Sequence, residues 1–109
     1  MATTYKVLGQ SAPAATTEAD LYTVPAATSA IVSTITVANR AATAGTYRVY
    51  VRKLGAVVAN AQYLIYDASL SGNSTDTMTL GITLAATDVV SVYASTANFS
   101  FNAFGTELS

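Results

Sequence analysis

The stretch "AIVSTITVAN", from Ala30 to Asn39, decides the fold class of this chain. Its side chains alternate between the two faces of an extended strand, with Ile31, Ser33, Ile35 and Val37 against Val32, Thr34, Thr36 and Ala38. Most of them are β-branched, and such residues are stiff at χ1 and suit a pleated surface better than a helix. The stretch therefore predicts a β-strand.

Similar signals recur on both sides of this stretch, and clusters of turn residues separate them. The densest turn is "SGNSTD" (Ser71 to Asp76), where Gly, Asn, Ser and Asp favour a tight reversal of the chain. We expect seven further strands, at Thr4 to Gln10, Asp20 to Val24, Thr46 to Lys53, Gln62 to Leu70, Thr77 to Leu84, Val89 to Ser95 and Asn98 to Leu108.

About eight short strands separated by turns predict an all-β protein without significant helix. We expect a single antiparallel β-sandwich domain over residues 1–109, with residues 1–4 as a short N-terminal arm. Jelly-roll and immunoglobulin-like Greek-key connections both fit, because the pattern does not contain the strand order. The predicted core comprises Ile31, Ile35, Val37, Tyr47, Val49, Val51, Leu64, Met78, Leu80, Ile82, Val90, Val92, Phe99 and Phe101.

The chain offers little material for catalysis. It contains no histidine and no cysteine, and only 10% of its residues are charged, where about 25% is usual. Asp76 and Asp88 are a conceivable carboxylate pair at one end of a sandwich, and Asn73 with Asp76 offers oxygen ligands for calcium, but a plain turn explains these residues better. We expect no enzyme activity, no catalytic residue, no cofactor and no metal.

Nucleic acid and membranes are also poor partners for this composition. The segment "YRVYVRK" interleaves basic and aromatic side chains, as base-stacking sheets do, but the whole chain has only five basic residues and a net charge of −1. No uninterrupted apolar stretch approaches the roughly 18 residues that a spanning helix needs. We expect neither nucleic-acid binding nor a membrane segment.

A protein neighbour is the best explanation for strands that are apolar on both faces in a chain with so few charges. Tyr50, Tyr63 and Tyr66 lie on strands whose other face is already apolar, and tyrosine is favoured at interfaces. Arg48 and Arg52 share the Tyr50 face and suit pairing with carboxylates or carbonyls of a partner. These five residues are the predicted protein interface.

The whole chain resembles small all-β virion structural proteins of tailed bacteriophages, most recognisably in "LYTVPA" and the strand that ends at Asn39 and Arg40. The resemblance implies a decoration or cement protein, which binds the outside of the capsid shell as a symmetric oligomer and stabilises capsid subunit contacts. It also implies the major capsid protein or another virion protein as partner, self-association as a homotrimer, synthesis in the bacterial cytoplasm and a place in the virion.

Two alternatives stay open at this point. The first is a tail, neck or baseplate accessory protein, including a fibre or receptor-binding component. A fibre tip needs aromatic side chains on loops for sugar stacking, whereas most aromatics here lie on predicted strands. The second is a sandwich binding module unconnected with a virus.

Overall fold

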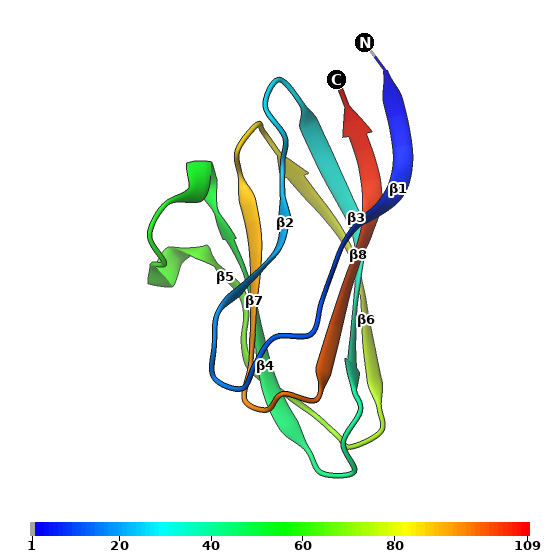
Figure 1. Ribbon diagram of the computed structural model, residues 1–109, viewed down its shortest axis with the longest axis vertical. Helices are drawn as coiled ribbons and strands as arrows, with labels where there is room; N and C mark the ends of the chain where they lie inside the picture. The colour runs from blue at the N-terminus through cyan, green and yellow to red at the C-terminus, as the bar shows by residue number, and fades with distance from the viewer. Residues whose placement is uncertain (1) are drawn as a thin grey trace.

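The computed structural model describes residues 2–109 and contains two four-stranded sheets packed face to face (Figure 1). Two short 3-10 turns, η1 (Lys53–Gly55) and η2 (Asn60–Gln62), lie between β4 and β5, and residues 2–109 contain no α-helix. The predicted all-β sandwich is confirmed. Its strands are β1 (Thr3–Ser11), β2 (Ala19–Thr23), β3 (Ser29–Asn39), β4 (Gly45–Arg52), β5 (Tyr63–Leu70), β6 (Thr75–Leu84), β7 (Val89–Ala94) and β8 (Phe99–Leu108).

The strand order resolves the connectivity that the sequence leaves open. One sheet has the order β1-β8-β3-β6 and the other β2-β7-β4-β5. All neighbouring strands are antiparallel, and only the β4–β5 connection stays within one sheet. Eight strands wound in this order across two sheets form a jelly roll.

The core lies between the sheets and agrees with most of the predicted list. Val32, Val49 and Val92 are fully buried at its centre, and Phe99 and Phe101 fill the end near the β3–β4 turn. Met78, Leu80 and Ile82 pack against this core but are only partly buried.

The core prediction is wrong for two residues, Ile31 and Leu64. Ile31 is 40% exposed, because β3 shifts register against both of its neighbours between Val32 and Thr34. Such a bulge reverses which side of the strand faces inward, so Val32 points into the core before it and Ile35 after it. Leu64 is 51% exposed, because the irregular pairing of β5 with β4 turns the next residue, Ile65, toward the core instead.

The beginning of the chain also differs from the prediction. Thr3 and Thr4 are the first residues of β1 and do not form a free arm, while Met1 lies outside the described residues. The amide of Ala2 donates to the carbonyl of Ser109 at 2.6 Å, and Ser109 donates back at 2.9 Å. Thr3 and Thr4 then pair with the last residues of β8. Both ends of the chain therefore lie together at one end of the sandwich (Figure 1).

Candidate interaction surfaces

Arg48 is the centre of an aromatic cluster on the outer face of the β2-β7-β4-β5 sheet. Its guanidinium carbon lies 4.3 Å from the ring centroids of both Tyr66 and Tyr93. Its Nε and Nη2 donate to the two carboxylate oxygens of Asp67 at 2.6 and 3.2 Å. This hydrogen bonding raises the pKa of Arg48 and lowers that of Asp67, so both groups stay charged.

Three predicted interface tyrosines continue this cluster, but they differ in exposure. Tyr50 is only 1% exposed, and its hydroxyl donates to Glu18 at 2.7 Å. Its ring contacts Tyr63, which meets Tyr66 edge-on at 4.8 Å and 85°. Because the rings are steeply inclined, they do not form the flat platform on which a sugar or base stacks. Only Tyr66 is strongly exposed, at 58%. We call Arg48, Tyr50, Tyr63, Tyr66 and Tyr93 the tyrosine–arginine cluster.

Arg52, the remaining predicted interface residue, is held by the chain itself. Its Nη2 donates to Asp20 at 2.9 Å and its Nε to the hydroxyl of Ser91 at 3.1 Å. Its Nη1 donates to the carbonyls of Gly55 and Ala56, which fixes the connection between β4 and β5. The carboxylate and carbonyl partners of Arg52, which we expected on another protein, are therefore present within this domain.

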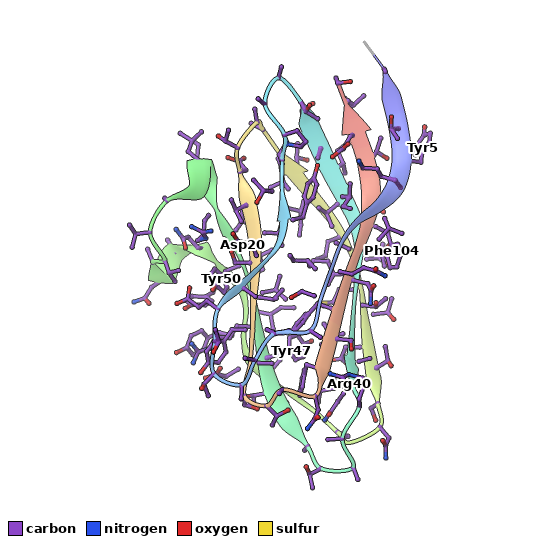
Figure 2. The ribbon with its side chains drawn as sticks, in the orientation of Figure 1. Tyr5, Asp20, Arg40, Tyr47, Tyr50 and Phe104 are labelled. Carbon is purple, nitrogen blue, oxygen red and sulfur yellow. The ribbon has the colours of Figure 1, made fainter. Side chains whose placement is uncertain are left out.

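A different surface lies on the outer face of the β1-β8-β3-β6 sheet. Tyr5 is 81% exposed, Val7 49%, Ile31 40% and Phe104 36%. Val7 on β1 pairs with Phe104 on β8, and Tyr5 and Ile31 pair with Thr106 from its two sides. Phe104 and Thr106 are two residues apart on β8, so the four apolar side chains share one face of the sheet. Figure 2 shows Tyr5 and Phe104 on the side of the molecule away from Tyr47 and Tyr50. We call these four residues the apolar stripe.

The rest of this face carries hydroxyls and amides, but no charge. The four strands contain three charged residues, Lys6, Asp76 and Glu107. Asp76 pairs with the buried Val37 and Glu107 with the buried Ala30, while Lys6 and the buried Val32 both pair with Gly105. Because paired residues share a face of the sheet, all three charged side chains point inward. The outward rows beyond the stripe consist mainly of threonines, such as Thr34 opposite Thr79. We call this whole surface the uncharged face.

The inward-pointing charges are all used within the sandwich. Lys6 forms an ion pair with Glu107 at 2.8 Å, and the hydroxyl of Tyr22 donates to the same carboxylate at 2.5 Å. Tyr47 donates to Asp76 at 2.8 Å. These tyrosines belong to the opposite sheet, so each hydrogen bond links the two sheets. Burial, followed by the hydrogen bond to the carboxylate, raises the pKa of both tyrosines.

The two carboxylates that the sequence offered as a pair lie apart in the structure. The hypothetical pair of Asp76 and Asp88 is wrong, because Asp76 lies near the start of β6 and Asp88 lies beyond the other end of that strand. The carboxylate of Asp88 instead accepts hydrogen bonds from the backbone amides of Leu54 and Ala85, both at 2.9 Å. In residues 2–109 no three His, Cys, Asp or Glu side chains are grouped as metal ligands.

One shallow hollow lies beside the start of β8. It has a volume of about 330 Å³ and is widely open to solvent. The side-chain amide of Gln10 donates to Asn102 across it at 2.8 Å. Its lining residues, none of them charged, are Gln10, Ser11, Ala12, Ser100, Phe101 and Asn102.

The chain matches no protein-family model, no curated protein and no solved structure. No helix within residues 2–109 is long and apolar enough to cross a membrane. Together, the strand order and the two surfaces define a jelly-roll domain. One outer face carries charged side chains that form ion pairs within the domain, and the other outer face is uncharged.

Proposed function

We propose that this protein is a non-enzymatic virion structural protein, a decoration protein that binds the outside of a capsid shell as a symmetric oligomer. The observation that carries the proposal is the uncharged face with its apolar stripe. Exposed apolar side chains that are contiguous and free of charge are typical of protein interaction sites. The sequence resemblance to phage virion proteins supports the shell as the partner.

The physical basis of binding is burial of the stripe against a capsid subunit. Tyr5 is the most exposed residue of the stripe, and aromatic side chains such as Tyr5 and Phe104 contribute most to such contacts. The threonine rows around them can hydrogen-bond without the cost of desolvating a charge. Each contact is modest, but an oligomer engages several capsid subunits at once, so avidity gives firm attachment and ties neighbouring subunits together.

The distribution of charge favours this role over nucleic-acid binding. Lys6, Arg48 and Arg52 each form an ion pair with a carboxylate of the chain. Arg40 donates to the carbonyl of Ala97 at 3.0 Å. A phosphate backbone is bound through several free cationic side chains on one surface, and the paired cations of this domain do not supply that arrangement.

A tail, neck or baseplate accessory protein is the second candidate function. The uncharged face fits another virion protein as well as it fits a capsid subunit. The exposed ring of Tyr66 adds an aromatic contact on the opposite side of the domain, which offers a second contact to a neighbouring tail protein.

The test is co-sedimentation of the purified protein with capsids assembled without it and, separately, with purified tails. The double variant Tyr5→Ser/Phe104→Ser should lose most of its binding to capsids. The matched control Tyr66→Ser removes an exposed aromatic ring from the other face and should bind like wild type. Binding to tails alone would move the protein to the second candidate, and equal binding by all three proteins would exclude the uncharged face as the docking surface.

A further inference from the structure

The four strand edges of the sandwich are protected to different degrees. β1 and β2 are edges on the same side, and they pack against each other so closely that a Cβ at Gly9 would overlap the carbonyl of Leu21. β2 is also short, with five residues. β5 pairs irregularly with β4, and its Asp67 has a positive φ of 50°. Short length, irregularity and charge are devices that prevent edge strands from pairing with other chains.

β6 has fewer of these devices, because its one irregularity is the register shift against β3 between Val32 and Thr34. It is a ten-residue edge strand without proline or any residue of positive φ, and its single charge, Asp76, is its second residue. From Thr77 to Leu84 its backbone presents a row of hydrogen-bonding groups on the side away from β3. Such an edge is a template for another strand.

The side chains of β6 indicate that the neighbouring strand has the same chemistry. Met78, Leu80 and Ile82 face the core but are only partly buried, and the alternating outward residues are exposed threonines and Gly81. A strand added at this edge therefore needs apolar residues on the inner side and small polar residues on the outer side. β6 itself has this pattern.

We infer that β6 pairs antiparallel with β6 of a second copy of this chain about a two-fold axis, joining two four-stranded sheets into one continuous sheet. The sequence "TMTLGITL" is self-complementary in this arrangement. With the axis at Leu80, Met78 lies opposite Ile82 of the second copy and Thr77 opposite its Thr83. With the axis at Gly81, Leu80 lies opposite Ile82 of the second copy. Neither register brings two carboxylates together, because Asp76 lies far from the axis.

The pair has a consequence that rests on the proposed function. A two-fold axis perpendicular to a sheet keeps the same face outward in both copies, so the two apolar stripes lie on one side of the joined sheet. The dimer then presents two docking surfaces to one shell, and the second contact forms at high effective concentration. The pairing itself does not depend on a shell, so it is tested on the isolated protein.

The test is the mass of the full-length protein in solution, measured by light scattering on a size-exclusion column. Wild type should have twice the chain mass. The variant Thr77→Lys/Thr79→Lys/Thr83→Lys places lysines opposite lysines across the axis and should have the chain mass at the same concentration. The matched variant Thr77→Glu/Thr79→Glu/Thr83→Lys places glutamates opposite lysines and should remain dimeric. All three positions are exposed, and circular dichroism checks that both variants fold.

A second variant keeps the inference testable if the charged variants fail to fold. The chain contains no cysteine, and a Cβ at Gly81 has no atom within 4 Å. Oxidised Thr79→Cys/Gly81→Cys should run as a cross-linked dimer on a non-reducing gel, and Thr3→Cys on the β1 edge should not. A wild-type monomer or trimer, equal masses for the two charged variants, or no cross-link would overturn the pairing. Capsid binding by a trimer would then still support the proposed function, whereas capsid binding by a monomer would support docking on the shell but not the symmetric oligomer.

Discussion

The outer faces of the two sheets use their side chains in opposite ways. On the β2-β7-β4-β5 sheet, the side chains of the tyrosine–arginine cluster interact within the domain. Arg48 lies between Tyr66 and Tyr93 and forms an ion pair with Asp67. On the β1-β8-β3-β6 sheet, charges point inward and apolar side chains point out. Figure 2 shows two of the outward side chains, Tyr5 and Phe104. The charged side chains therefore stabilise the domain itself. The apolar side chains of the stripe, which no sequence motif marks, form the surface that is free to contact a partner.

The largest effect should come from the shared core, which supports both faces. Val49 is 0% exposed and lies on β4 between Arg48 and Tyr50. Val49→Asp should abolish folding, because an unpaired buried carboxylate costs several kcal/mol, on the order of the total stability of a domain. Circular dichroism should show loss of the sheet signal. A cooperative melt near that of wild type would mean that β4 is assigned to the wrong side.

The next effect should come from the tyrosine–arginine cluster. Arg48→Ala removes the two stacking contacts and the ion pair with Asp67, and should lower the free energy of unfolding by about 1 kcal/mol, since the pair is partly solvent-exposed. Arg48→Lys keeps the charge but not the planar stack, so it should recover only part of the loss. Urea unfolding measures both. An unchanged Arg48→Ala variant would show that the cluster does not stabilise the fold.

A smaller effect should appear as a pH dependence of stability. The hydrogen bonds from Lys6 and then Tyr22 lower the pKa of Glu107 in the folded protein. A lowered folded pKa means that this stabilisation is present above the ordinary carboxyl pKa and is lost as the pH falls through the folded value. The melting temperature should fall in acid, and Glu107→Gln should reduce that dependence. Identical pH profiles would rule out a contribution from this group.

The smallest effect on stability should come from the apolar stripe. Tyr5 is 81% exposed, so Tyr5→Ser should change the free energy of unfolding by no more than about 0.5 kcal/mol. The same substitution should weaken docking on a partner. A loss of stability comparable to that of Arg48→Ala would mean that the two faces do not differ in the way described above.

Local patterns in the sequence were sufficient for the strands but not for their order. Alternation along β3 and the turn at Ser71 to Asp76 depend on neighbouring residues, and each predicted strand is present. The bulge after Val32 depends on pairing with β6 and β8, so Ile31 was placed on the wrong side. Alternation alone cannot reveal a register shift that arises between strands distant in sequence.

The surfaces were harder to predict for the same reason. Arg48 and Arg52 were conspicuous in the sequence, but Asp67 and Asp20, which pair with them, lie 19 and 32 residues away. Tyr5 and Phe104 meet only because the first and last strands are neighbours. The absence of charge from the uncharged face becomes visible only when four strands are placed side by side.

The central proposal, that the uncharged face docks on a virus particle, is tested most directly by chemical labelling of tyrosines. Tyr5 and Tyr66 are strongly exposed, at 81% and 58%, and they lie on opposite faces. Iodination followed by peptide mass analysis should label both in the free protein. On the particle, Tyr5 should be protected and Tyr66 should still react. Protection of Tyr66 with Tyr5 still reactive would contradict the account.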